Sequence, residues 1–140
     1  MRRDVILDTS PLVALINKKD NTHEWTKQQW SQIKPPLLTC ESVITESFFL
    51  LRNIYGGDTA VIRLLEKGVI TIAFDLESEI ESIKDLLTRY KSVPVSLADA
   101  CLVRMAEQNP NSSVFTLDSD FRIYRKNRNQ IIDLITPEDK

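Results

Sequence analysis

Five acidic residues in this sequence stand at positions from which carboxylates could share one ion: Asp8, Glu46, Asp99, Asp118 and Asp120. A set of ligands made only of carboxylate oxygens, without histidine or cysteine, suits a hard cation such as Mg²⁺ or Mn²⁺ rather than Zn²⁺. Several carboxylates in one small cleft repel one another, which raises their pKa values or requires a cation. The residue types therefore indicate a metal site, provided that the fold brings them together.

Asp8 ends the first apolar run, Val5-Ile6-Leu7, and comes just before a helix start at Ser10-Pro11. A carboxylate near a helix N-terminus is stabilised by the helix dipole, and this needs no catalytic role. Ser10 as the N-cap and Pro11 at the first helical position already supply the start signal, so Asp8 is not needed as the cap. This leaves Asp8 available for a functional role.

The other acids also have structural explanations. Asp99 follows Ser96 by three residues, which is the spacing of a capping box, although a cap and a site role can coexist at a helix start. Glu46 belongs either to an exposed stripe of its helix or to a polar pocket, because a buried unpaired charge would be costly. Asp118 and Asp120 follow an apolar run, where they could start a helical turn or supply metal ligands directly or through water.

Strand and helix patterns alternate along the chain. Short apolar or β-branched runs predict strands at 5–7, 37–40, 69–74, 113–117 and 131–134. Amphipathic or capped segments predict helices at 10–16, 22–33, 42–55, 59–67, 76–90 and 96–108, and a short helix after Asp118. We expect helix 42–55 to be largely buried, because its apolar positions cover most of its circumference. Trp25 and Trp30 are expected to be packing residues.

This alternation predicts a mainly parallel sheet with helices on both faces. In such sheets, ligands bind outside the carboxyl ends of the strands. Asp8 and Asp118 fall at that edge, and Glu46 and Asp99 lie in the opening turns of two helices. We therefore expect these four carboxylates to converge at one end of the sheet.

The composition fits one globular domain of 140 residues, of which 42% are apolar and 27% are charged. The net charge of −2 does not mark the whole surface as a binder of polyanions, so nucleic-acid binding would have to depend on local charge. The apolar run near the start is too short to predict a signal peptide, and no apolar window is long enough to predict a membrane span. Because Cys40 and Cys101 also form no Cys-x-x-Cys pair, we expect a cytoplasmic protein with reduced thiols.

Four pieces of the sequence resemble the PIN domain: Val5-Ile6-Leu7-Asp8-Thr9-Ser10, Glu46 in its helix, Ser96-Leu97-Ala98-Asp99-Ala100 and Thr116-Leu117-Asp118-Ser119-Asp120-Phe121. Their order and spacing match along nearly the whole chain, and the most similar subgroup is the VapC-type toxins of prokaryotic toxin–antitoxin pairs. The resemblance implies a single PIN-like domain over residues 1–140. It implies a three-layer α/β/α sandwich with a mainly parallel, roughly five-stranded sheet. It also implies a ribonuclease that needs Mg²⁺ or Mn²⁺.

The resemblance assigns roles to individual residues. The catalytic quartet falls on Asp8, Glu46, Asp99 and Asp118. The metal ligands fall on Asp8, Asp99, Asp118 and the auxiliary acid Asp120. Thr9 and Ser10 become polar neighbours of the metal and the substrate. The expected partners are an RNA substrate, an antitoxin protein and a second copy of the chain in a homodimer.

An RNA substrate also requires positive charge near the acidic site. The segment 122–128 directly follows the acidic loop and contains four cations and no acid: Arg122, Arg125, Lys126 and Arg128. We expect these side chains to contact RNA phosphates. The structural alternative is an ordinary solvated helix face.

Three other functions would use a similar pattern. A phosphoacceptor signalling domain would need paired acids after the first strand, where Thr9 and Ser10 stand, and a lysine after a late strand, although Asp75 does follow the third strand. A haloacid-dehalogenase-like phosphatase would need an aspartate at position 10, which is Ser10. A PIN domain that acts in RNA processing or binds RNA without a toxin role stays open, and metal-dependent turnover separates a silent binding module from an enzyme.

Overall fold

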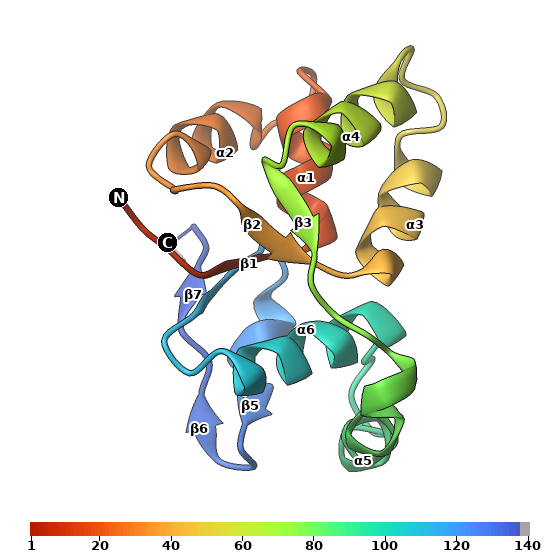
Figure 1. Cartoon of the computed structure of the whole chain (residues 1–140), viewed down its shortest axis with the longest axis vertical. Helices are drawn as coiled ribbons and strands as arrows, with labels where there is room; N and C mark the ends of the chain where they lie inside the picture. Colours follow the sequence, from red (N-terminus) through yellow and green to blue (C-terminus); the bar gives the residue numbers. More distant parts are fainter. Residues whose placement is uncertain (138–140) are drawn as a thin grey trace.

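Five parallel strands form the central sheet of the computed structural model, which describes residues 1–137 (Figure 1). They are β1 (Val5–Leu7), β2 (Leu37–Thr39), β3 (Ile70–Ile72), β4 (Ser113–Phe115) and β7 (Leu134–Ile135). Their spatial order is β3-β2-β1-β4-β7, and every neighbouring pair is parallel. The chain builds one half of the sheet outward from β1 and then returns to build the other half. The C-terminal ends of β1 and β4 therefore flank the topological switch point.

Helices cover both faces of this sheet, as the sequence predicts. On one side lie α1 (Thr9–Ile16), α2 (His23–Trp30), α3 (Glu41–Leu50) and α4 (Gly57–Glu66) (Figure 1). On the other side lie the 3₁₀ turn η1 (Glu77–Glu79), α5 (Ile80–Arg89) and α6 (Leu97–Gln108) (Figure 1). Right-handed crossovers explain the division, because the direction of winding reverses after β3. Among residues 1–137, no helix has both the length and the apolar character needed to cross a membrane.

The core is built around the central strands. All three residues of β1 are fully buried, because a central parallel strand packs against helices on both faces. On β4, the buried ring of Phe115 contacts two rings of α2. Its centroid lies 6.0 Å from that of Trp25 and 5.9 Å from that of Trp30. The two tryptophans therefore pack α2 onto the sheet, which confirms their predicted packing role.

The C-terminal region differs from the prediction. The expected strand at 131–134 is wrong, because β6 (Gln130–Ile131) pairs antiparallel with β5 (Arg125–Lys126), and the fifth strand of the main sheet is β7. Ile131 is 75% exposed whereas Ile132 is 3% exposed, so one apolar run is divided between two environments. Segment 122–128 is also not a helix face, since it runs from the end of the 3₁₀ turn η2 (Ser119–Arg122) into the β5–β6 hairpin.

Helix α3 is shorter and less buried than predicted. It ends at Leu50 rather than near Tyr55, and its buried residues are Val43 and Ser47. Phe49 is 61% exposed, although the apolar composition predicts a mostly buried helix. The difference arises because α3 packs through one stripe against α1, α4 and α6, which leaves the opposite apolar stripe at the surface.

Replacing Phe115 with alanine should destabilise the protein strongly, because the ring is fully buried against α2 and its loss leaves a cavity. We expect the free energy of unfolding to fall by about 3–5 kcal/mol in urea denaturation. Tyr55→Ala is the control, because Tyr55 is fully exposed and its loss should leave the midpoint unchanged. Equal shifts in the two variants would contradict the place of Phe115 in the core.

Candidate active site

Asp8 lies at the C-terminal end of β1, where its carboxylate is only 5% exposed. Its Oδ1 accepts a hydrogen bond from the Thr9 backbone N–H at 2.7 Å, and its Oδ2 accepts one from the Thr116 hydroxyl at 2.7 Å. Asp8 is therefore the N-cap of α1, and the prediction of Ser10 as the cap is wrong. The helix begins directly after the strand, and the Ser10 hydroxyl accepts from the Leu117 backbone N–H at 3.1 Å instead.

The pKa of Asp8 is raised to about 7, mainly by burial and in part by the negative charges of Asp99 and Asp118, against the lowering effect of the hydrogen bonds from Thr116 and Thr9. The ionised carboxylate is disfavoured because it has lost water and faces like charge. At neutral pH, a nearby cation would therefore stabilise the ionised form of Asp8.

Asp99 lies in the first turn of α6 and forms the predicted capping box with Ser96. Its backbone N–H donates to Ser96 Oγ at 3.0 Å, and its Oδ2 accepts from the Ser96 backbone N–H at 3.3 Å. The buried Tyr124 hydroxyl also donates to Asp99 Oδ2 at 3.1 Å. Burial raises the pKa of Asp99, and the charge of Asp118 adds to that rise. The cap and the acidic cluster therefore use the same carboxylate.

Tyr124 and Thr116 are residues of the site that the sequence analysis missed. Burial and the charge of Asp99 raise the pKa of Tyr124, so its hydroxyl remains a hydrogen-bond donor at neutral pH. The Thr116 hydroxyl donates to Asp8 and accepts the Asp118 backbone N–H at 2.9 Å. No local sequence signal marks either residue, because both act across long separations in the chain.

The loop after β4 presents the next two acids. Asp118 is partly exposed, and its Oδ1 accepts the Asp120 backbone N–H at 2.9 Å, which fixes the start of η2. Asp120 is also partly exposed, and its charge contributes to the raised pKa of Tyr124. The predicted helix-initiating turn is thus present, and it holds both carboxylates on the rim of the acidic cluster.

Glu46 reaches the cluster from α3. It is exposed, and its Oε1 accepts a hydrogen bond from the buried Thr9 hydroxyl. Thr9 therefore connects two acids, because its backbone N–H donates to Asp8 and its hydroxyl donates to Glu46. The four acids of the predicted quartet are brought to one region at the switch point.

The chemistry of this donor set fits a hard divalent cation. Asp99 and Asp118 lie near enough to Asp8 to raise its pKa, Asp118 also raises the pKa of Asp99, and the donor atoms of all three side chains are oxygens. Within residues 1–137, no three acidic, histidine or cysteine side chains are already arranged as a complete metal-binding group. Mg²⁺ does not require such a cage, because it retains several waters and binds proteins through one or two carboxylates.

The basic segment beside the acids has structural tasks of its own. Arg125 Nη1 donates to the carbonyls of Arg122, Ile123 and Tyr124 at 2.6, 3.2 and 3.0 Å. Lys126 Nζ donates to the Pro110 carbonyl at 3.2 Å. Arg122 Nη2 donates to the Pro137 carbonyl at 3.3 Å, and Arg128 is exposed at the hairpin turn. The proposed contacts of these four cations with RNA stay predictions.

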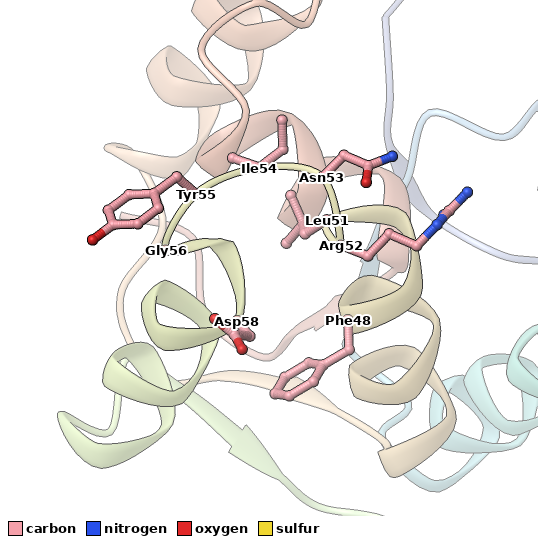
Figure 2. Close-up of a pocket in the computed structure, with 8 residues that line it drawn as sticks. All are labelled: Phe48, Leu51, Arg52, Asn53, Ile54, Tyr55, Gly56 and Asp58. Atoms are coloured by element: carbon pink, nitrogen blue, oxygen red, sulfur yellow. The ribbon is translucent and has the colours of Figure 1, made fainter.

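A surface hollow of about 570 Å³ lies between α3 and α4 (Figure 2). Figure 2 shows Phe48 and Asp58 on its two sides and Tyr55 at its rim. None of the five predicted acids lines it. It is therefore distinct from the acidic cluster at the switch point.

The sequence and the fold were compared with known proteins. A family model described as the PIN domain matches residues 5–127. The chain belongs to the PIN domain family. Ribonuclease VapC26 of Mycobacterium tuberculosis strain H37Rv is 28% identical over 116 residues, which cover 81% of this chain and 86% of that protein. The predicted family membership is thus confirmed.

The solved structure of a toxin has the same fold as this chain. The crystal structure of M. tuberculosis VapC20, a toxin that cleaves the sarcin–ricin loop, matches with a TM-score of 0.74 at 22% identity. The match covers 83% of this chain and 91% of VapC20. The α/β fold class is therefore confirmed. A single domain over residues 1–140 stays a prediction, and residues 138–140 lie outside the described part.

The raised pKa of Asp8 predicts how stability varies with pH when a chelator removes divalent metal. Between about pH 4 and pH 7 the folded chain keeps a proton that the unfolded chain releases, so stability should fall as pH rises. Asp8→Asn should reduce this loss by roughly 2–4 kcal/mol, measured by urea denaturation at pH 4.5 and 7.5. A residual slope is expected, because the pKa of Asp99 is also raised.

Asp75→Asn is the control for this experiment, because Asp75 is an exposed aspartate that follows β3 and does not belong to the cluster. It should keep the slope of the unchanged protein. If Asp8→Asn also keeps that slope, the unusual protonation of Asp8 is refuted.

Proposed function

We propose that this protein is a divalent-metal-dependent endoribonuclease that hydrolyses RNA phosphodiester bonds, and that it is the toxin of a VapBC-type toxin–antitoxin pair. The main support is the convergence of Asp8, Asp99 and Asp118 at the switch point of a PIN-family fold. The names of the relatives agree with it, since one is a ribonuclease and another is an RNA-cleaving toxin.

In this proposal Asp8, Asp99 and Asp118 hold Mg²⁺ or Mn²⁺, and Asp120 assists from the rim. The cation would make a hydroxide available near neutral pH and offset charge on the phosphoryl oxygens. Thr116 orients the Asp8 carboxylate, and Tyr124 orients the Asp99 carboxylate. Each of these hydroxyls fixes one oxygen of its acid.

Glu46 has a different role in the proposal. It is more exposed than Asp8 and Asp99, and Thr9 holds one of its oxygens. Its other oxygen can therefore orient the attacking water and accept a proton from it. Ser10 contributes indirectly, because its hydroxyl holds the backbone of the Asp118 loop at Leu117.

The proposal extends to the partners. An antitoxin protein, a homodimer and a cytoplasmic location are proposed from the similarity to VapC proteins. The exposed apolar side chains Phe48, Leu50 and Ile62 of α3 and α4 are compatible with protein contacts. Buried Cys40 and Cys101 are both free thiols, which is compatible with a reducing compartment.

The decisive experiment is cleavage of a fluorophore-labelled RNA with Mg²⁺ or Mn²⁺, with and without chelator. Asp8→Asn and Asp99→Asn should each lower kcat by about 10²–10⁴-fold, because each removes a charge that positions the cation. Asp75→Asn, an exposed aspartate after β3, should cleave at the rate of the unchanged protein.

Two outcomes would contradict the proposal. RNA binding without metal-dependent turnover would make the chain a silent RNA-binding PIN domain. Full activity in both Asp8→Asn and Asp99→Asn would show that another site does the chemistry.

The hairpin turn offers a test of how RNA is attracted. Arg128→Gln should weaken binding of RNA and reduce the slope of log K against log salt concentration by about 1, because one phosphate contact is lost. Arg63→Gln on α4 changes the net charge equally and should leave the slope unchanged. Identical slopes for Arg128→Gln and the unchanged protein would remove Arg128 from the RNA-binding surface.

A further inference from the structure

A cavity of about 610 Å³ opens beside Glu46, between α3 and the first turn of α6. Its walls include Thr45, Glu46 and Phe49 from α3, and Ser96 and Leu97 from α6. A volume of this size falls within the range of small-molecule sites in proteins. The cavity can therefore hold a group as large as a nucleobase.

One of the four proposed catalytic residues, Glu46, lines the cavity. On α3, Ser42, Glu46 and Phe49 share one stripe, because positions i, i+4 and i+7 recur on the same helix face. Phe49 lies about 4.5 Å along the helix axis from Glu46. On α6, Leu97 lies two residues before Asp99. The α3 wall of the cavity thus carries an apolar side chain on the same helix face as a predicted catalytic acid, and Leu97 is the apolar side chain of the α6 wall.

These apolar side chains are unusually open to solvent. Phe49 is 61% exposed and Leu97 is 43% exposed. The Arg52 guanidinium lies 4.0 Å from the centre of the Phe49 ring, and its Nη1 donates to the Phe49 carbonyl at 2.7 Å. The cation therefore covers one face of the ring from the side of the hollow in Figure 2, which Arg52 lines.

Polar side chains also line the cavity, with Glu41, Ser42 and Thr45 all contributing. A nucleobase has apolar faces and a polar edge, so it matches a lining that combines apolar side chains with hydrogen-bonding groups. Bases in single-stranded RNA loops are recognised in this way, by stacking on aromatic rings and by hydrogen bonds to their edges.

We propose that this cavity binds one unpaired nucleobase of the RNA substrate, adjacent to the scissile phosphate, by stacking it on Phe49 and against Leu97. This inference rests on the proposed function, because it takes RNA as the ligand, and it defines the substrate class. The base must leave its stack to enter the cavity, so the substrate is a loop or single strand rather than the interior of a duplex.

The first test measures cleavage of a single-stranded RNA and of the same sequence inside a duplex, with Mg²⁺. Phe49→Ala should raise KM for the single strand about 10-fold with little change in kcat, because stacking on an aromatic ring is lost. Phe49→Trp should restore KM, and Phe49→Leu should not, since leucine is apolar but cannot stack. The duplex should be the poorer substrate.

The matched control is Phe48→Ala. Phe48 is the neighbouring residue on α3, and its ring lies at the hollow shown in Figure 2 rather than in this cavity. Its removal should leave KM unchanged. Melting temperatures of all variants establish that each one is folded.

The second test reads binding without cleavage. A single-stranded RNA that carries 2-aminopurine is titrated into Asp8→Asn protein with Mg²⁺, with and without Phe49→Ala. The inference predicts that binding quenches the fluorescent base. Replacing Phe49 should remove this quenching and lower the affinity about 10-fold. This result supports the inference even if the chain cleaves no RNA. In that case the proposed function fails and the base site stands.

Three results would overturn the inference. The first is that the unchanged protein cleaves RNA while the Phe49→Ala and Phe48→Ala variants have the same KM and the same RNA affinity. Another is equal cleavage of the duplex interior and the single strand. The third is a change only in self-association on sedimentation, with RNA affinity unchanged, which would assign the Phe49 face to a protein contact.

Discussion

The burial of the Asp8 carboxylate is the constraint from which the organisation of this site follows. Burial in the centre of a protein is unfavourable for a charge, and the fold compensates for it with two hydrogen bonds, one from the Thr9 backbone and one from the Thr116 hydroxyl. Thr116 also receives the Asp118 backbone N–H, so the same hydroxyl fixes the loop that carries a second acid. Stabilising one buried charge therefore positions two carboxylates beside each other.

The topology of the sheet explains why acids distant in sequence meet here. The ends of β1 and β4 are neighbours because the winding direction reverses between them, although 108 positions separate Asp8 from Thr116. The first turns of α1 and α6 begin at the same edge, which adds Asp99 and gives it a cap and a tyrosine partner. Burial, with a smaller contribution from repulsion by neighbouring acids, raises the pKa values of Asp8 and Asp99, and a bound cation would stabilise their ionised forms.

Local patterns identified most of the elements and all of the candidate acids, and they failed where burial depended on distant neighbours. The capping box of Ser96 and Asp99 was predicted because it is local. The run Ile131-Ile132 was misassigned because one residue faces solvent and the next faces the core. The sequence predicted that helix α3 is largely buried, yet Phe49 is exposed near Glu46. At this position an apolar side chain is available to contact a ligand instead of packing in the core.

The sequence alone determined the chemical character of the site, because residue types and their positions after apolar runs are local properties. It specified carboxylates, their places at strand ends and helix starts, and the alternation that requires a parallel sheet. Only the tertiary structure decided which of these groups touch. It made Asp8 a buried cap with a pKa of about 7, and it assigned Thr116 and Tyr124 as partners of the acids. Burial, repulsion and hydrogen bonding between residues far apart in the chain arise only when the fold has closed.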